Sequence, residues 1–325
     1  MAINNHLIYL NRIPVNNKNY IFLIVISLSI MVYYSFKFVN TPLLVNSETV
    51  NKSPSVVSIK SLDALIMFFN KLDYNEETWK KENNIIPRIS FQGINDNWPA
   101  KSEKLPVKTK KSIFFRLMTP LVLIANENIL MERKIVEIAS LDEKKLIDIA
   151  IKYKILKIND QASVLTQAQR LSLLVRVDIL PPSLAVAQSA EESGWGTSRF
   201  ARKGNALFGQ WDFSGNGMKP KDQRQALGNY GVARFDSPLA SVEGYMLNIN
   251  TNNAYQKLRI LRSKLRTNNQ LIKGATLAGT LDKYSERGDA YIEGLRQMIR
   301  FNKLETLDGL TLSKEKLIHI NNVNN

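Results

Sequence analysis

The sequence predicts a mainly α-helical protein with a small β-hairpin lobe, preceded by a helical region and an N-terminal transmembrane helix. Three observations support this fold class. Residues 19–36 are uncharged and mostly apolar, apolar residues recur at helical spacing through most of 62–304, and residues 205–235 interrupt that spacing with glycines and aromatic residues. With 325 residues, of which 44% are hydrophobic, the chain can fill a folded core.

The uncharged run at 19–36 lies between Lys18 and Lys37. At 1.5 Å per residue a helix of this length reaches about 27 Å, enough to cross the apolar core of a bilayer. We therefore expect a transmembrane anchor at 19–38 after a cytoplasmic leader at 1–18, whose basic residues favour the inner side. A cleaved signal peptide is the alternative, although no small-x-small cleavage site follows the run.

Composition shifts divide the rest of the chain. Residues 39–60 are rich in Asn, Ser, Thr and Val without helical periodicity, which predicts a linker. A helical N-terminal region is expected at 61–160, and its apolar stretch at 112–125, too short to span a bilayer, predicts a buried helix. The main helical domain is expected at 161–304, and the Asn-rich tail at 305–325 is expected to fray.

Helix boundaries are marked within the main domain. The pair at 181–182 is Pro-Pro, which predicts a break between two helices because proline suits the first turn of a helix but not its interior. Gly194 and Gly196 are natural terminators of the second helix. Glycines and asparagines at 215–229 predict hairpin turns, and Asp-Ser at 236–237 offers a cap for the next helix.

Charge and composition restrict the chemistry. The net charge of +15 suits a polyanionic partner such as nucleic acid, a membrane surface or an acidic cell-wall polymer. There is no Cys, and the two histidines, His6 and His319, lie at opposite ends of the chain. This excludes disulfides and Cys-rich metal sites and argues against a Ser-His-Asp triad. Carboxylates, Tyr, Ser and Lys remain for catalysis, and we expect neither a metal nor another cofactor.

Glu192 is the strongest catalytic candidate. It falls on the same helix face as Gln188, among small and polar residues, and in the last turn before Gly194. There the negative end of the helix dipole opposes a carboxylate, and an adjacent Trp195 that excludes water would raise its pKa further. A carboxyl group kept protonated near neutral pH can act as a general acid. The alternative is an exposed Glu beside a helix end.

Four segments carry a family resemblance: AQSAEESGWG, GNALFGQW, ARFDSPLASVEGYMLNINTNNAYQKLR and YSERGDAYIEGLRQMI. Over about 165–302 the chain resembles the glucosaminidase family that includes flagellar peptidoglycan hydrolases, and within it most closely the bacterial Bax-like proteins. The resemblance implies a lysozyme-like helical fold with a small β lobe and cleavage of the β-1,4 linkage after N-acetylglucosamine. It also implies that Glu192, directly before Ser-Gly-Trp-Gly, is the general acid.

The same resemblance implies a catalytic tyrosine. The family segment Tyr-Ala-x-Asp-Pro-x-Tyr-Ala is matched in part by YSERGDAYI, with one extra residue between Tyr284 and Tyr291 and no Pro after Asp289. Tyr284, the first of the pair, is our candidate, since a phenol can donate a hydrogen bond without carrying charge. Packing of this Tyr in the core is the alternative.

A second carboxylate is harder to find, because no Glu lies between Glu192 and Glu243. Asp222 is the candidate for a second catalytic acid, and Asp212 is another acidic residue in this stretch. The sequence is also compatible with a single-acid mechanism in which the N-acetyl group of the substrate attacks, or with weak or lost activity.

Aromatic side chains near Glu192 are candidates for substrate binding. Trp195, Phe208 and Trp211 could offer flat surfaces to sugar rings, and Asn205 could hydrogen-bond to N-acetyl groups. Core packing is the alternative for the aromatic residues, and for Phe208 above all.

The predicted function is that of a peptidoglycan hydrolase, an endo-β-N-acetylglucosaminidase in which Glu192 is the general acid. A lytic transglycosylase and a non-catalytic peptidoglycan-binding module remain open. The expected partners are peptidoglycan glycan strands and, through the N-terminal helix, the inner membrane, with the catalytic domain facing the periplasm. An exported domain does not meet nucleic acid, which we therefore do not expect as a partner.

Overall fold

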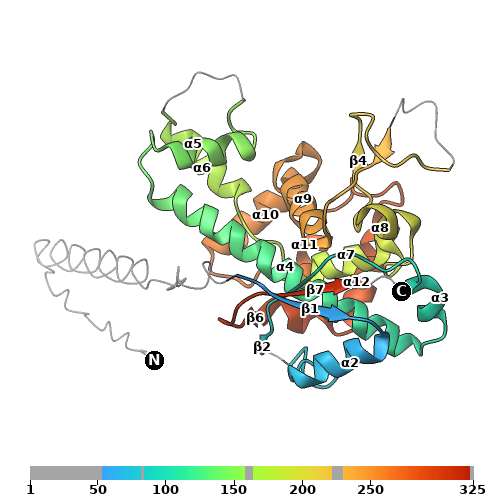
Figure 1. Cartoon of the computed structure of the whole chain (residues 1–325). Helices are drawn as coiled ribbons and strands as arrows, with labels where there is room; N and C mark the ends of the chain where they lie inside the picture. The colour runs from blue at the N-terminus through green and yellow to red at the C-terminus, as the bar shows by residue number, and fades with distance from the viewer. Residues whose placement is uncertain (1–52, 82–83, 158–163, 222–229, 323–325) are drawn as a thin grey trace, which may run out of the picture. The chain divides into compact units, whose positions relative to one another are not determined.

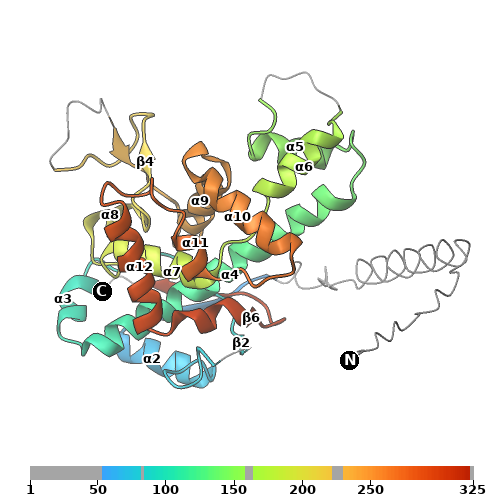
Figure 2. The ribbon, with the colours of Figure 1, turned by 180° about the vertical axis from the view of Figure 1, so that it is seen from behind.

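The fold is mostly helical, as the sequence predicts (Figures 1 and 2). The described residues also form three small sheets, of which one, antiparallel, lies in the expected β lobe at 205–235, whereas the two parallel sheets were not expected. The computed structural model describes residues 53–81, 84–157, 164–221 and 230–322. The expected leader at 1–18, the anchor at 19–38 and most of the linker at 39–60 lie outside these residues. By internal contacts, Lys52–Asn325 form one unit, in which the N-terminal helical region packs against the main helical domain.

Eleven α-helices are present in the described ranges: α2 (Leu62–Lys71), α3 (Trp98–Glu103), α4 (Val107–Ile138), α5 (Lys144–Lys152), α6 (Gln167–Arg176), α7 (Pro182–Ser193), α8 (Arg199–Gly204), α9 (Pro238–Thr251), α10 (Gln256–Thr267), α11 (Gly274–Ala278) and α12 (Asp289–Phe301). Two 3₁₀ helices are η3 (Asn253–Tyr255) and η4 (Leu304–Gly309). The strands are β1 (Ser55–Ile59), β2 (Ile85–Ile86), β3 (Ile89–Phe91), β4 (Trp211–Asp212), β5 (Gly231–Val232), β6 (Thr311–Leu312) and β7 (Ile318–Asn322).

Helix α4 forms the centre of the core. Its residues from Ser112 to Asn126 are almost all buried, so the expected buried helix at 112–125 is confirmed. The helix packs against α7 and α9. Its Arg116 is tolerated inside because the guanidinium donates to the carbonyl of Tyr74 at 3.1 Å and lies 4.5 Å from the centre of the Phe69 ring.

Helix α4 is also the one described helix that is long and apolar enough to cross a membrane. Of the apolar 18-residue stretch of this helix, 78% is buried inside the fold, as expected of a core helix. The expected anchor at 19–38 is a different segment.

Helices of the main domain begin at local signals of the sequence. Helix α6 begins with a capping box, in which Thr166 and Gln169 each satisfy the backbone N–H of the other. Helix α7 begins at Pro182, as expected from the Pro-Pro pair. Ser237 caps α9 by accepting a hydrogen bond from the backbone N–H of Ala240. Helices α7 and α9 therefore begin where the sequence predicts them, and the turn expected at 228–229 lies outside the described residues.

The C-terminal tail differs from expectation. We expected residues 305–325 to fray, but β7 is the central strand of a parallel sheet with the order β1-β7-β3, and β6 pairs in parallel with β2. Strand β1 also lies in the range expected to be a linker. The backbone N–H and C=O groups of β7 form hydrogen bonds with both β1 and β3. This pairing with strands near the other end of the folded unit orders a segment whose polar sequence shows no strand pattern.

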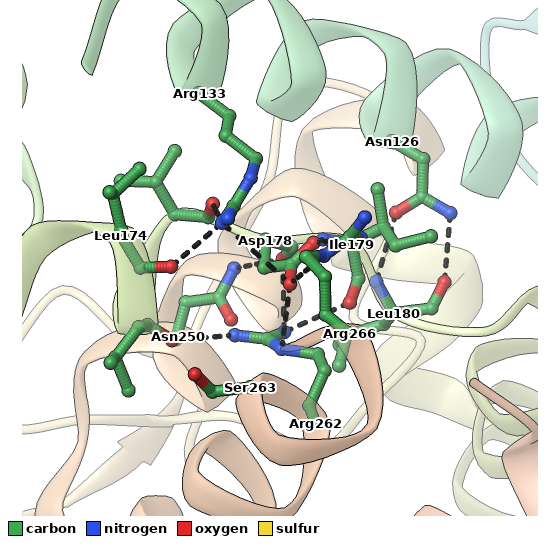
Figure 3. Close-up of polar contacts among 12 residues, drawn as sticks. Asn126, Arg133, Leu174, Asp178, Ile179, Leu180, Asn250, Arg262, Ser263 and Arg266 are labelled. Carbon is green, nitrogen blue, oxygen red and sulfur yellow. Dashed lines mark hydrogen bonds and ion pairs between the residues drawn. The ribbon is translucent and has the colours of Figure 1, made fainter. Parts of the chain in front are cut away.

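A buried arginine cluster holds the connection between α6 and α7 (Figure 3). Asp178, which is 2% exposed, accepts hydrogen bonds from Nε and Nη2 of Arg266 and lies 3.8 Å from Nε of Arg262 and 3.7 Å from Nη1 of Arg133. Arg262 is fully buried and donates to the carbonyls of Asp178 and Ile179, both at 2.9 Å. The cluster fixes the chain immediately before α7.

Candidate active site

The C-terminal end of α7 presents Glu192 beside a left-handed turn. Gly194 ends the helix with φ 57°, and Trp195 and Gly196 continue with φ 61° and 78°. A Cβ at Gly196 would lie 2.9 Å from the Cδ1 of Ile94, so both conformation and space favour glycine here. The expected helix end is therefore confirmed, and it leaves Glu192 in the last helical turn.

Three side chains form a directed chain of hydrogen bonds that ends on Glu192. The hydroxyl of Tyr245 donates to Oε1 of Gln188 at 2.5 Å, and Nε2 of Gln188 donates to the hydroxyl of Tyr291 at 3.1 Å. The hydroxyl of Tyr291 then donates to Oε1 of Glu192 at 2.9 Å. Because Gln188 and Tyr245 are fully buried and Tyr291 is 1% exposed, this chain holds the carboxyl group in one orientation.

Burial raises the pKa of Glu192 above its ordinary value. The hydrogen bond from Tyr291 favours the carboxylate and lowers the pKa, the charge of Glu191 raises it, and Arg287 lowers it; the effect of burial is the largest of these. The result is the direction that a general acid requires, because more of the carboxyl group stays protonated near neutral pH.

The other carboxyl oxygen, Oε2, faces the loop between α8 and β4. A Cβ on Gly209 would lie 3.7 Å from this oxygen, and Gly209 has φ 60°. Within the described part of the chain, Oε2 receives no hydrogen bond, whereas Oε1 accepts from Tyr291. The oxygen with room for a proton is thus the one directed at the backbone of the β lobe.

Glu191 and Arg287 form an ion pair next to this carboxyl group. Nη2 of Arg287 lies 2.6 Å from Oε1 of Glu191, and the guanidinium lies 5.2 Å from the centre of the Tyr291 ring. The side chain of Arg287 is 55% exposed and that of Glu191 is 35% exposed, so this ion pair lies near the surface, while Glu192 lies deeper beside the tyrosines.

Our candidate Tyr284 lies one ring further from Glu192. Its ring stacks on Tyr291 with centroids 5.4 Å apart, and its hydroxyl donates to the carbonyl of Phe208 at 3.3 Å. Tyr291, the second tyrosine of the pair, makes the contact with Glu192. Sequence alone placed both tyrosines in the motif, but the packing of α12 against α7 brings Tyr291, on α12, to the carboxyl group, while Tyr284 lies in the turn before that helix.

Two predicted substrate-binding residues have other contacts. Phe208 is 3% exposed and stacks on Tyr245 with centroids 3.9 Å apart, so it is a core residue and offers no face to a sugar ring. Asn205 ends α8 in the left-handed region, and its Nδ2 donates to the carbonyl of Phe235 at 3.1 Å. This hydrogen bond holds the loop together, and the role of Asn205 toward an N-acetyl group stays a prediction.

Trp195 is partly buried against α4. Its ring lies edge-on to Phe114 and Phe115, with centroids 5.8 and 5.2 Å apart, and Nζ of Lys111 lies 5.0 Å from the centre of the indole ring. These contacts explain why the residue is large and aromatic without a ligand. Its role toward a sugar stays a prediction.

Trp211 is the predicted aromatic residue that remains open to solvent. It is 52% exposed on β4, where it stacks on Tyr230 at 5.0 Å and lies 5.9 Å from Phe213, which is 66% exposed. Trp211 is two residues after Gly209, the residue beside Oε2 of Glu192. The alternation of Trp211 and Phe213 was the sequence signal that could have added Phe213 to the candidates.

Neither of the two aspartates considered as a second acid is seen opposite Glu192 in the described part of the chain. Asp222 lies outside the described residues. Asp212 accepts a hydrogen bond from the backbone N–H of Ser214 at 2.8 Å, and bonding to Ser214 lowers its pKa, which suits a residue that organises a turn. Within the described ranges, no three or more His, Cys, Asp or Glu residues gather as potential metal ligands.

Comparisons with known proteins agree with these features. The model of the glucosaminidase family, described as mannosyl-glycoprotein endo-beta-N-acetylglucosaminidase, matches residues 168–304. The chain is 31% identical over 218 residues to Protein bax of Escherichia coli (strain K12), a match that covers 63% of this chain and 76% of that protein. No solved structure shows significant similarity, so the lysozyme-like likeness stays a prediction. The family match contains the whole of α7 and α12, and the chain belongs to the glucosaminidase family as a Bax-like member.

Proposed function

We propose that this protein hydrolyses the glycan strands of peptidoglycan as an endo-β-N-acetylglucosaminidase with Glu192 as its general acid. The observation that carries the proposal is the asymmetry of the Glu192 carboxyl group. Burial raises its pKa, Oε1 accepts a hydrogen bond from Tyr291, and Oε2 faces the β lobe beside Gly209. A proton on Oε2 therefore lies on the side of Glu192 that faces the β lobe, while the hydrogen bond to Oε1 holds the carboxyl group in its orientation.

The chemistry needs a single protein acid if the substrate supplies the nucleophile. Protonated Glu192 donates its proton to the glycosidic oxygen while the bond from that oxygen to the anomeric carbon breaks. The carbonyl oxygen of the neighbouring N-acetyl group bonds to the anomeric carbon and forms a cyclic oxazolinium. Glu192, now a carboxylate, takes a proton from water as the water oxygen attacks the same carbon, which opens the ring and restores the acid.

The β lobe supports sugar binding close to this carboxyl group. Trp211 on β4 and Phe213 directly after this strand are exposed, and Tyr230 backs the indole of Trp211. A pre-ordered aromatic surface binds the apolar face of a sugar ring with little loss of side-chain freedom. We place a sugar next to the cleaved bond on Trp211.

The proposed location follows from the sequence. An apolar anchor at 19–38 would hold the protein in the inner membrane, and the basic leader before it would keep the catalytic domain in the periplasm. A net charge of +15 favours binding to an anionic cell wall.

Digestion of purified peptidoglycan by the full-length protein tests this function. Wild type should release fragments with reducing N-acetylglucosamine ends, identified by mass spectrometry. Glu192→Gln should lower the rate by roughly 100-fold or more, the usual contribution of a general acid. Glu191→Gln is the matched control and should retain most activity, because Glu191 is paired with Arg287 at the surface.

Other products would point elsewhere. Anhydro sugar ends would indicate a lytic transglycosylase instead. Binding of wild type to the wall without release of fragments would indicate a non-catalytic module. Equal release by wild type and Glu192→Gln would remove the proposed general acid.

A further inference from the structure

The hydrogen-bond chain that ends on Glu192 begins at a residue that does not touch it. Tyr245 of α9 is fully buried, its ring stacks on Phe208, and among the described residues its hydroxyl bonds to Oε1 of Gln188. Gln188 lies about one helical turn before Glu192 on α7, and Tyr291 of α12 links the two. The chain thus joins three helices at one carboxyl group.

The lengths of the two hydrogen bonds to Gln188 indicate which way its amide points. The contact with the Tyr245 hydroxyl is 2.5 Å, a length that O–H···O bonds reach and that is too short for a usual N–H···O bond. The contact with the Tyr291 hydroxyl is 3.1 Å, within the range of N–H···O bonds. The amide oxygen therefore faces Tyr245, and the amide nitrogen faces Tyr291.

Both tyrosines keep their hydroxyl hydrogens. Burial raises the pKa of Tyr245 and of Tyr291 well above the ordinary value of a tyrosine, so each phenol is neutral and has one hydrogen to donate. Tyr245 donates its hydrogen to the amide oxygen of Gln188. Because the amide nitrogen can only donate, the hydrogen of Tyr291 goes to Oε1 of Glu192 instead.

This direction decides which oxygen of Glu192 carries the acid proton. An oxygen that accepts from Tyr291 is the unprotonated oxygen of a neutral carboxyl group, so the proton lies on Oε2, the oxygen beside Gly209. With the amide reversed, the Tyr291 hydrogen would go to Gln188, and the Tyr291 oxygen would accept a proton from Oε1. The acid proton would then point at a buried tyrosine and away from the β lobe.

We propose that Tyr245 is a positioning residue for the general acid, because it fixes the direction of the Gln188 amide and so keeps the proton of Glu192 on Oε2. This inference rests on the proposed function, since it assigns a role in proton donation by Glu192. It deepens that function by naming a residue that is separated from the carboxyl group by two other side chains.

The carbonyl band of protonated Glu192 reports which oxygen carries the proton. Infrared difference spectra against the same protein with Glu192→Gln isolate this band at a pH where the carboxyl group is protonated. With the proton on Oε2, the carbonyl oxygen is Oε1, and its hydrogen bond from Tyr291 lowers the stretching frequency. With the proton on Oε1, the carbonyl oxygen is Oε2, which no described side chain bonds to, and the band lies at higher frequency.

Tyr245→Phe in the full-length protein removes one oxygen atom and leaves the ring on Phe208. The amide is then free to turn, and both of its directions make one hydrogen bond with Tyr291. We expect a second band at higher frequency beside the wild-type band. We also expect kcat for glycan cleavage to fall roughly twofold or more with KM unchanged, because part of the molecules hold the proton on the wrong oxygen.

Tyr255→Phe is the matched control. Tyr255 is another buried tyrosine of this region, with its ring 5.8 Å from that of Tyr284, and it does not belong to the chain that ends on Glu192. The variant loses a buried hydroxyl as Tyr245→Phe does, but it should keep the wild-type band and the wild-type kcat.

Three outcomes would overturn the inference. One is a single band at the wild-type frequency in Tyr245→Phe, and another is the same second band in Tyr255→Phe. The third needs no change at Tyr245: Tyr291→Phe removes the donor to Oε1, and a band that stays at the wild-type frequency would show that Oε1 is not the carbonyl oxygen. Failure of the proposed function looks different, since wild type would then release no fragments from peptidoglycan even if the bands followed the predicted pattern.

Discussion

Removing the charge of Asp178 should destabilise the fold strongly without touching the candidate active site. Asp178→Asn keeps the size of the side chain but leaves Arg133, Arg262 and Arg266 without their shared anion (Figure 3). Arg262 is fully buried, and burial lowers its pKa to about 10, so it stays charged at neutral pH.

The expected loss in the free energy of unfolding follows from the burial of the three arginines. Breaking a buried ion pair by removing one partner costs about 3–5 kcal/mol. Arg266 is 35% exposed and can regain hydration, whereas Arg262 has no access to water and keeps only its bonds to backbone carbonyls. We therefore expect the lower end of the range, about 3 kcal/mol.

Urea unfolding of the full-length protein, followed by tryptophan fluorescence, measures this loss. The exposed Asp142→Asn is the matched control and should change the free energy of unfolding by less than about 0.5 kcal/mol. A loss below about 1 kcal/mol for Asp178→Asn would refute the reasoning, because exposed ion pairs have values of that size.

Three further predictions concern the site and its support. Tyr291→Phe removes the hydrogen bond that lowers the pKa of Glu192, so the basic limb of the pH profile of kcat/KM should move to higher pH; an unchanged limb would show that the bond has no influence. Trp211→Ala should weaken glycan binding by about threefold to tenfold with little loss of stability. Phe208→Ala should instead lower the free energy of unfolding by about 3–5 kcal/mol, because this side chain is buried. A loss of stability for Trp211→Ala and none for Phe208→Ala would contradict these roles. Burial raises the pKa of Asp308 to about 6, so the folded state binds this proton more tightly than the unfolded chain does. Its contribution to stability is present in full below about pH 4, near the ordinary pKa of an Asp, and is lost as pH rises through about 6. Urea unfolding from pH 4 to 7 should show this decline, and Asp308→Asn should flatten it.

Local signals in the sequence predicted the helices around the site. Pro182 at the start of α7 and Gly194 at its end bracket Glu192, because each residue has a backbone restriction or freedom that acts at its own position. The apolar stretch at 112–125 predicted the buried part of α4 for a similar reason, since its length and composition suit a core helix.

Contacts between distant segments were not predictable in the same way. The choice between Tyr284 and Tyr291 depends on how α12, which carries Tyr291, and the turn before it, which carries Tyr284, pack against α7, and motif spacing does not contain that packing. Strand β7 is ordered by pairing with β1 and β3, more than two hundred residues away along the chain, so its own polar sequence resembles a frayed tail.

The protonation state of Glu192 tests the central claim most directly. Infrared difference spectra of wild type and Glu192→Gln, recorded across a pH series, isolate the carbonyl band of the protonated Glu192 carboxyl group. The account predicts that this band persists above the pH at which an ordinary glutamate has lost its proton, and that it disappears only at higher pH. A band lost at or below the ordinary glutamate value would contradict the claim that the fold keeps this carboxyl group ready to donate a proton.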